Sequence, residues 1–551
     1  MSGLMMDSPL LISSLIEYAA RNHGDTEIVS RRVEGGIHRY DFAGCYRRTC
    51  QLAHALQRIG VEHGDRVGTL AWNTHRHFEL YYAISGIGAV IHTVNPRLFA
   101  EQIVYIISHA RDRVLFVDLN VVPLLESLAD QLPGVKTYVV MCQAKDMPET
   151  SLADGQREVL SYESLLESSP ESFDWPIFDE REASALCYTS GTTGSPKGVL
   201  YNHRSTVLHA FSLCSANSAL PLSCRETVMP VVPMFHVHAW GIPYAAPMAG
   251  ARIVFPADRL DGASLYELLQ GESVTQAAGV PTIWHALLEH MAEHGVTLDA
   301  LRNLVVGGSA APLTLIEQFE EQHGVNVCHA WGMTEMSPVG TTGMLKPKFD
   351  ALDIAQQREI KLKQGRMVYG VQMKIVDDEG VEQATDGVQV GQLLVRGPWI
   401  ASAYFDDEEG TSQAFTPDGW FRTGDVSTLD SDGHMQIVDR SKDLIKSGGE
   451  WISSIDLENE AIGHPDVVEA AAIAVADDKW GERPMLVIVA RAGSGLSADD
   501  VLAWLKDRVA RWWLPERVLF MERIPHTATG KISKAQLREQ VAAMEMADDQ
   551  G

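Results

Sequence analysis

The stretch Tyr188–Val199, Tyr-Thr-Ser-Gly-Thr-Thr-Gly-Ser-Pro-Lys-Gly-Val, combines residue types that a polyphosphate-binding loop needs. Its three glycines let backbone N–H groups approach a ligand, because no Cβ stands in the way. Its hydroxyls and Lys197 add hydrogen-bond donors and positive charge. The spacing differs from the common P-loop, because Pro196 stands where that pattern needs its second glycine. A flexible surface loop has a similar composition, so phosphate binding is one of two interpretations.

A second segment that could contact a ligand follows the buried-type strand Leu304–Val306. It reads Val306-Gly307-Gly308-Ser309-Ala310, and its two glycines permit close approach to a planar base or an acyl chain. A tight strand-to-helix turn without any ligand is the alternative. We favour ligand binding, because Pro312 and the helix-like run Leu313–Gln322 place this turn at a helix N-terminus.

The pattern at 188–198 resembles the signature of the adenylate-forming enzymes. These are acyl-CoA synthetases, firefly luciferase and the adenylation domains of nonribosomal peptide synthetases. The match is long and specific, and further motifs follow in the family's order over nearly the whole chain. The nearest likeness is to bacterial medium- and long-chain fatty acid–CoA ligases and methylthio-propionate–CoA ligases. The resemblance implies ATP and coenzyme A as co-substrates, Mg²⁺ as cofactor and a small-molecule carboxylic acid as the activated group.

The resemblance assigns the nucleotide to several motifs. Trp331, within His329–Glu335, would stack on adenine, although many relatives carry tyrosine there. Asp425, at the end of Trp420–Asp425, would accept hydrogen bonds from the ribose hydroxyls. Taken alone, the tryptophan would be a core residue and the aspartate a turn residue. The expected nucleotide-binding residues are Ser190, Gly191, Thr193, Gly194, Lys197, Gly308, Ser309, His329, Ala330, Trp331, Gly332, Thr334, Asp425 and Arg440.

The resemblance also implies the catalytic and metal-binding residues. Glu335 would ligate Mg²⁺, a cation that prefers one or two carboxylates plus phosphate oxygens. Thr192 would be the hydroxyl partner of the metal or the phosphates. Lys531, in Pro525–Lys531, would bridge the acid's oxygen and the α-phosphate as charge develops. Without the resemblance, Lys531 would be an ordinary surface lysine.

Ser441–Trp451 would serve the second half of the reaction. In the family a hinge falls at the position of Lys442, between residues 1–441, the expected N-terminal adenylation domain, and residues 442–551, the expected mobile C-terminal domain. A charged linker is the alternative interpretation. The expected CoA-binding residues are Lys446, Gly448, Gly449 and Trp451.

Met234–Trp240 resembles the family's wall between acyl tunnel and nucleotide, and Trp240 would gate that tunnel. An apolar core stretch with two satisfied histidines is almost as good an interpretation. Small or soft neighbours would leave room for an alkyl chain. The expected acyl-pocket residues are His236, Val237, Trp240, Gly307 and Met336.

These residues need a scaffold, and the periodicity predicts an α/β fold. Helical spacing in Pro9–Asn22, Tyr40–Ile59 and Thr74–Ala89 alternates with short strand-like runs at Val67–Ala71, Val114–Val117 and Thr137–Val140. After the expected connection Ser151–Glu180, a second α/β stretch runs from Ala183 to about Gly340. Val371–Val376, Gly391–Arg396 and His434–Val438 then predict a small antiparallel or β-barrel-like unit. We therefore expect two α/β subdomains plus that unit in the large N-terminal domain, and an α+β C-terminal domain.

The composition limits the location and partners of the chain. The net charge of -28 over 551 residues argues against a nucleic-acid or anionic-membrane surface. Seven scattered cysteines without a C-x-x-C pair fit reduced thiols better than disulfides or zinc. The sequence predicts neither a signal peptide nor a membrane span, so we expect a cytoplasmic protein, with a homodimer compatible.

The leading hypothesis is an AMP-forming ligase that joins a medium- to long-chain fatty acid to CoA through an acyl-AMP. The same chemistry on a short acid such as 3-methylthiopropionate is the nearest alternative. Loading of a free-standing carrier protein is a further enzyme alternative, and a non-catalytic acyl or nucleotide sensor is the alternative from another class.

Overall fold

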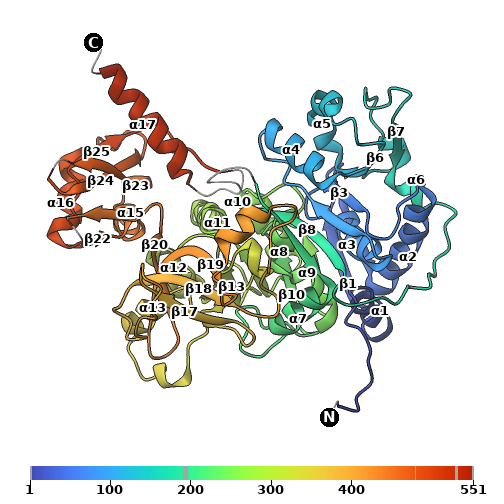
Figure 1. Cartoon of the computed structure of the whole chain (residues 1–551), viewed down its shortest axis with the longest axis horizontal. Coiled ribbons are helices and arrows are strands. Elements are labelled where there is room, and N and C mark those ends of the chain that lie inside the picture. The colour runs from blue at the N-terminus through green and yellow to red at the C-terminus, as the bar shows by residue number, and fades with distance from the viewer. Residues whose placement is uncertain (1–2, 190–195, 449, 478, 528–531, 549–551) are drawn as a thin grey trace.

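The computed structural model describes residues 3–189, 196–448, 450–477, 479–527 and 532–548, which form a large N-terminal part and a smaller C-terminal domain (Figure 1). The large part holds two seven-stranded sheets and a four-stranded sheet, and the small domain holds a five-stranded sheet. The predicted α/β class is confirmed.

One seven-stranded sheet has the order β7-β6-β5-β3-β4-β8-β9 and is parallel except for its last strand. Its strands are β3 Arg66–Leu70, β4 Val90–Thr93, β5 Val114–Val117, β6 Thr137–Val140, β7 Glu158–Ser161, β8 Ala183–Tyr188 and β9 Gly198–Asn202. The helices of this region are α2 Phe42–Arg58, α3 His75–Gly86, α4 Ala100–Ala110, α5 Val122–Leu128 and α6 Tyr162–Leu166. The expectation of a plain connection over 151–180 was wrong, because this segment carries the edge strand β7 and helix α6.

The other seven-stranded sheet has the order β14-β13-β12-β10-β11-β1-β2. Its strands are β1 Glu27–Arg31, β2 Ile37–Asp41, β10 Thr227–Pro230, β11 Arg252–Phe255, β12 Gln276–Gly279, β13 Asn303–Val306 and β14 Asn326–His329. Its helices are α1 Ser13–Asn22, α7 His203–Leu213, α8 Val237–Trp240, α9 Ile242–Ala249, α10 Gly262–Gly271, α11 Pro281–His294 and α12 Leu313–His323. The first strand of the chain pairs in parallel with β11, so the N-terminus contributes to the sheet that is built mainly from later sequence.

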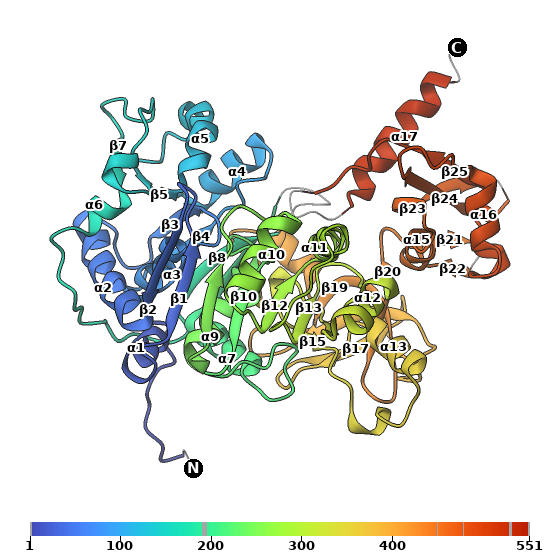
Figure 2. The ribbon, with the colours of Figure 1, turned by 180° about the vertical axis from the view of Figure 1, so that it is seen from behind.

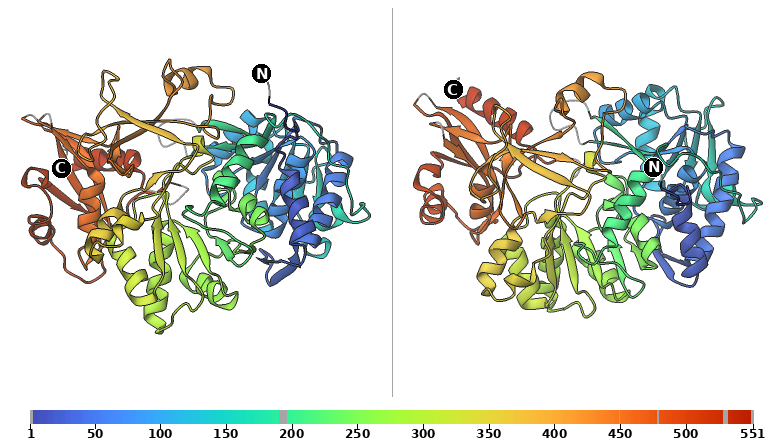
Figure 3. Two further views of the ribbon diagram at one scale, coloured as in Figure 1. Left: turned by 90° about the horizontal axis from the view of Figure 1, so that it is seen from below. Right: turned by 60° about the horizontal axis from the view of Figure 1, so that its bottom comes forward.

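The two large sheets share one buried core. Side chains alternate between faces along a strand, and Ile28 and Ile253 of one sheet join Val67 and Ile91 of the other in a single buried cluster with α2, α3 and α9. The opposite face of the sheet that holds β1 packs against α10, α11 and α12, and Val29 belongs to that cluster. Figures 2 and 3 show these layers from behind and from below.

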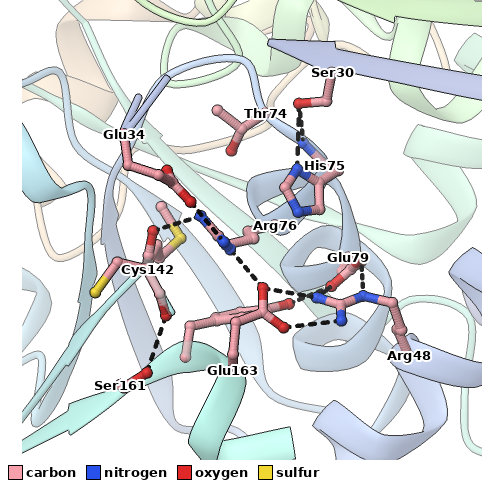
Figure 4. A network of polar contacts seen from close by, with 12 residues as sticks. Ser30, Glu34, Arg48, Thr74, His75, Arg76, Glu79, Cys142, Ser161 and Glu163 are labelled. Carbon is pink, nitrogen blue, oxygen red and sulfur yellow. Dashed lines mark hydrogen bonds and ion pairs between the residues drawn. The ribbon is translucent and has the colours of Figure 1, made fainter. Parts of the chain in front are cut away.

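A network of ion pairs links the loop between β1 and β2 to the helices α2, α3 and α6 of the sheet that holds β3–β9 (Figure 4). Arg48 on α2 pairs with Glu79 on α3 at 2.8 Å and with Glu163 on α6 at 2.9 Å. Arg76 pairs with Glu163 at 2.8 Å and with Glu34, which lies between β1 and β2, at 2.9 Å. These side chains are largely buried and paired with opposite charges, so the network links the loop between β1 and β2 to α2, α3 and α6.

The unit that follows is an open antiparallel sheet in the order β17-β18-β19-β20. Its strands are β17 Gln372–Val376, β18 Gly391–Arg396, β19 Phe421–Leu429 and β20 Met435–Arg440, flanked by α13 Ile354–Leu362, α14 Glu408–Ala414 and the short pair β15 Thr341–Thr342 and β16 Arg366–Met367. The antiparallel prediction is confirmed, but the described residues do not close this sheet into a barrel. The sequence pattern also missed β19.

The C-terminal domain lies against the end of this small sheet (Figure 3). Its sheet contains β21 Ile445–Ser447, β22 Glu450–Ile452, β23 Val467–Asp477, β24 Gly481–Ala490 and β25 Arg517–Phe520, and its helices are α15 Ser454–Ile462, α16 Ala498–Leu505 and α17 Lys534–Asp548. The α+β expectation is confirmed. Within the described ranges, the helices are too short or too polar to cross a membrane.

Candidate active site

The ends of β8 and β9 hold the base of the predicted phosphate loop. The Thr189 N–H donates to the Lys197 carbonyl at 2.9 Å, and the Lys197 N–H donates to Thr189 Oγ1 at 3.1 Å. The loop between them contains Ser190, Gly191, Thr192, Thr193 and Gly194, which lie outside the described residues, as do Gly449 and Lys531. Their predicted roles stay predictions.

Trp331, Asp425 and Arg440 meet at one corner of the site. The indole Nε1 of Trp331 donates to Asp425 Oδ2 at 3.0 Å, and Arg440 Nε lies 2.8 Å from Asp425 Oδ1. Asp425 is buried on β19, and Arg440 is partly exposed at the end of β20. The structure therefore brings Trp331 together with two residues that lie about ninety or more positions later in the sequence. Each aspartate oxygen can still accept another hydrogen bond, because an ionised carboxylate offers about four lone-pair sites.

Glu335 lies beside this corner, on a short 3₁₀ turn, Thr334–Met336. It is 5% exposed, and the hydroxyl of Tyr404 donates to its Oε1 at 2.7 Å. Burial raises the pKa of the Glu335 carboxyl above its ordinary value, while the Tyr404 hydroxyl and the charges of Arg440 and Lys197 oppose that rise. The acid thus lies within the electrostatic reach of both the Arg440 corner and the phosphate-loop lysine.

Lys197 points to the same region. Its Nζ lies 4.7 Å from the ring centre of Tyr404. A hollow of about 310 Å³ is lined in part by Lys197, Arg422, Tyr404 and Gly424. Two cations beside a hollow in a chain of net charge -28 form the local basic patch that an anionic ligand needs.

These residues fit a magnesium ion bound together with a polyphosphate. Among the described residues, no three or more His, Cys, Asp or Glu side chains gather as a metal site. Glu335 instead offers one buried carboxylate near a lysine and an arginine. Mg²⁺ is commonly held by one or two carboxylates with substrate phosphate oxygens, so this donor set suits it better than a metal held by protein ligands alone.

The chain is tightly packed where β13 and β14 end. A Cβ on Gly307 would lie 2.9 Å from both the Ala330 carbonyl oxygen and the Trp240 ring, so only glycine fits there. The neighbouring Gly308, Ser309 and Ala330 lie at the same strand ends. His329 is buried and its Nδ1 lies 3.1 Å from the Leu362 carbonyl, and burial lowers its pKa to about 4.

Met336 and Gly332 lie close to Trp331 in the chain. Met336 is fully buried in the cluster that contains Trp331 and the small sheet. The Gly332 backbone bridges to Val339, and the Tyr201 hydroxyl donates to the Thr334 carbonyl. All of these contacts lie within the chain, so the predicted nucleotide and acyl roles of these residues stay predictions.

The predicted acyl-pocket wall adopts a left-handed turn. Val237, His238, Ala239 and Trp240 all have φ between 47° and 56°, and Gly241 follows at 79°. This conformation costs roughly 1–2 kcal/mol for each residue that carries a Cβ. Burial of the first three side chains in the core offsets part of that cost. Trp240 is thereby held over Gly307, whereas His236, which precedes the turn, is half-buried.

The His238 side chain has a polar partner inside the core. Its Nε2 lies 3.3 Å from Cys187 Sγ, and burial lowers its pKa to about 3. The side chain is therefore a neutral core residue, which was the alternative interpretation for the histidines of this segment.

Of the predicted CoA-binding residues, the described Lys446, Gly448 and Trp451 belong to the hairpin β21–β22, where Lys446 pairs with Trp451. The Lys446 N–H donates to Glu482 at 2.7 Å, and the Gly448 N–H donates to the Trp480 carbonyl at 2.7 Å. These bonds tie the hairpin to β24, so it is part of the C-terminal domain.

Two hydrogen bonds cross the predicted hinge at Lys442. Asp439 Oδ2 accepts from the Ser454 N–H at 2.7 Å, and the Ser453 hydroxyl donates to the Val438 carbonyl at 2.6 Å. Just beyond the hinge, Asp443 pairs with Arg538 of α17 at 2.6 Å. The N-terminus of α15 is thus docked on the end of β20.

Tyr404 is the site residue that the sequence motifs missed. It lies between β18 and α14, outside every quoted motif, and no spacing pattern marks it. The convergence of Lys197, Trp331, Glu335 and Asp425 on one region is nevertheless the arrangement that the motifs predict.

Comparison with known proteins identifies relatives over the whole chain. Residues 16–405 match the sequence family described as AMP-binding enzyme, and residues 456–531 match the AMP-binding enzyme C-terminal domain. A 3-methylmercaptopropionyl-CoA ligase of Ruegeria pomeroyi is 49% identical, over 98% of this chain and 99% of that protein. A medium-chain-fatty-acid–CoA ligase of Ectopseudomonas oleovorans is 47% identical, over 98% of this chain and 97% of that protein.

A solved structure has the same fold from end to end. The anthranilate CoA ligase AuaEII, solved in complex with anthranoyl-AMP, superposes with a TM-score of 0.85 at 25% identity, over 98% of this chain and 99% of that one.

Proposed function

The chain belongs to the family of AMP-binding enzymes, and from this premise we propose that it joins a short or medium-chain carboxylic acid to CoA through an acyl-AMP. The acid's oxygen bonds to the α-phosphorus of ATP and pyrophosphate leaves. The CoA sulfur then bonds to the acyl carbon, and AMP leaves together with the thiol proton. The observation that carries this proposal is the convergence of Trp331, Asp425, Glu335 and Lys197.

The nucleotide would be held at the corner made by Trp331, Asp425 and Arg440. The Trp331 ring would stack on adenine, and base stacking on an aromatic ring typically contributes about 1–3 kcal/mol. Asp425 accepts from the indole and pairs with the guanidinium, so its orientation is set before any ribose arrives. A carboxylate that is already oriented loses little entropy on binding the ribose hydroxyls.

Glu335 would hold Mg²⁺, and Lys197 would contact the phosphates. The bound metal would supply positive charge against the triphosphate. Glu335 is buried and accepts a hydrogen bond from Tyr404, a residue that also lines the hollow, so its carboxylate would reach a metal ion bound beside Tyr404. Lys531, a prediction outside the described residues, would bring a second ammonium to the α-phosphate from the C-terminal domain.

The Trp240 ring packs against Gly307 at the end of β13, so it would limit the length of an acid bound there. A ring held by a strained turn moves less readily than one on a flexible loop. This favours short or medium acids, 3-methylthiopropionate among them, over long fatty acids.

The test is a panel of acids. We expect AMP formation that requires both acid and CoA, with kcat/KM for 3-methylthiopropionate, butyrate or octanoate at least tenfold above that for palmitate. Trp240→Ala should raise the palmitate-to-butyrate ratio by about tenfold, whereas Trp512→Ala, at a partly exposed position, should leave it unchanged.

A best rate with palmitate in the parent chain would contradict the size argument while leaving the reaction intact. ATP binding without acid-dependent release of pyrophosphate would contradict the reaction itself and support a sensor.

A further inference from the structure

Tyr404 connects two parts of the site that the sequence motifs treat separately. Its hydroxyl donates to Glu335 Oε1 at 2.7 Å, and its ring centre lies 4.7 Å from Lys197 Nζ. One aromatic side chain therefore contacts both the acid proposed for the metal and the lysine proposed for the phosphates.

The backbone around Tyr404 is fixed to both partners as well. The Ala401 N–H donates to the carbonyl of Glu335 at 2.7 Å. The Phe405 N–H donates to the carbonyl of Gly198, the residue after Lys197, at 2.8 Å. The backbone of the segment 401–405 is therefore hydrogen-bonded at one end to Glu335 itself and at the other end to the residue that follows Lys197.

A further hydrogen bond holds the segment: the Tyr404 N–H donates to Thr411 Oγ1 at 2.9 Å, which ties it to α14. Asp406 also forms an exposed ion pair with Arg111, at the end of α4, at 2.8 Å. A side chain on a backbone held in this way has few other positions, so it can impose its own position on its neighbours.

The physical effect on each partner differs. A phenol that donates to one carboxylate oxygen restricts rotation of the Glu335 carboxylate and leaves the other oxygen for a cation. The ring face attracts the Lys197 ammonium and holds it beside the hollow. Partners one step beyond a metal ligand commonly contribute tenfold or more to metal affinity.

We propose that Tyr404 is a positioning residue for ATP activation: its hydroxyl orients Glu335 toward Mg²⁺ and its ring orients Lys197 toward the phosphates. The inference rests on the proposed function, because it assumes that these two residues serve a metal-bound nucleotide.

The test measures metal binding directly. Mn²⁺ is titrated into the full chain with α,β-methylene-ATP, which cannot transfer its adenylate, and free Mn²⁺ is followed by electron paramagnetic resonance. We expect Tyr404→Phe, which removes the hydroxyl and keeps the ring, to weaken Mn²⁺ binding about tenfold. Tyr404→Leu, which also removes the ring, should in addition weaken metal-free nucleotide binding about threefold.

Two controls separate positioning from general damage. Tyr369→Phe makes the same change at a side chain that is 99% exposed and should change nothing. In a Glu335→Gln background, Tyr404→Phe should cause no further loss of Mn²⁺ affinity, because the hydroxyl acts through that carboxylate. Acid-dependent pyrophosphate release by Tyr404→Phe should need more Mg²⁺, while thioester formation from supplied acyl-AMP should keep its rate.

Unchanged Mn²⁺ affinity in Tyr404→Phe would overturn the inference, as would an equal loss in the Glu335→Gln background. Failure of the parent nucleotide complex to bind Mn²⁺ would contradict the proposed metal site itself, and the inference with it.

Discussion

Asp425 illustrates how single residues of this site were predictable and why one was not. Its role followed from the Thr-Gly-Asp motif, and its contacts with Trp331 and Arg440 now place three motif residues together. Tyr404 lies outside any motif, because its importance comes from a packing contact between distant segments rather than from spacing. Local sequence patterns report turns and periodicity, and they do not report such long-range contacts.

His209 gives a prediction about pH. It is buried on α7, its Nε2 accepts the Val339 N–H at 3.2 Å, and burial lowers its pKa to about 3. The unfolded chain therefore binds this proton between about pH 6.5 and 3 while the folded chain does not, so stability falls as the pH drops through that window. At pH 5 the loss from this residue should be roughly 2 kcal/mol.

The measurement is urea unfolding of the parent and of His209→Gln at pH 7 and pH 5. The variant should lose about 2 kcal/mol less between the two pH values. His294→Gln, at an exposed position on α11, should behave as the parent does. Identical pH dependence in parent and His209→Gln would refute the assignment.

Secondary-structure elements were predicted best where a single hydrophobic pattern covers the whole element. Val114–Val117, Thr137–Val140 and Gly391–Arg396 were predicted residue for residue, because apolar runs between turn signals mark buried strands. β19 was missed, since Gly424 interrupts it and its register with β20 shifts between Val426 and Ser427. That irregular strand is the one that carries Asp425.

Gly307, which follows β13, contacts the Trp240 ring of the left-handed turn. This contact between two elements leads to a prediction. Gly307→Ala would push a methyl group to within 2.9 Å of the Ala330 carbonyl and the Trp240 ring. We expect a loss of about 1–3 kcal/mol in unfolding free energy. Displacement of the ring should also raise KM for the acid several-fold while KM for ATP changes little.

Urea unfolding and separate titrations of acid and ATP would measure both effects. Gly271→Ala is the matched control, because a Cβ there meets nothing within 4 Å. Equal increases in both KM values would show that the methyl group disturbs nucleotide binding as much as acid binding, which would contradict a specific role of the Trp240 ring toward the acid.

The whole molecule differs from the predicted order of the two α/β units at two places. The second unit was expected to begin at Ala183, but β8 and β9 complete the sheet that holds β3–β7, while β1 and β2 extend the sheet built mainly from Thr227–His329. Strand patterns do not encode which sheet a strand joins, and here long-range ion pairs such as Arg76–Glu34 help to decide it. The hinge at Lys442 also remains a prediction.

The bonds across that hinge make it testable. If the C-terminal domain turns about Lys442, the Asp439–Ser454 and Ser453–Val438 bonds exist in only one arrangement. Asp439→Ala should disfavour that arrangement by about 1 kcal/mol, so the two half-reactions should change by several-fold in opposite directions. Pyrophosphate release and thioester formation from supplied acyl-AMP, measured separately, check this.

Asp500→Ala removes a carboxylate that accepts the Ser497 N–H at the start of α16, within the C-terminal domain, and should leave the ratio of the two rates unchanged. A uniform slowing of both steps by Asp439→Ala would argue for a purely structural role.

The left-handed turn at Val237–Gly241 restricts how the enzyme could be re-engineered. Randomised libraries over these positions should return folded clones enriched in glycine, asparagine and aspartate, since those residues best tolerate positive φ. Large apolar replacements that would reshape the proposed acyl site are the ones this backbone tolerates least. Directed evolution toward new acids should therefore spare the turn and diversify the side chains that surround the Trp240 ring.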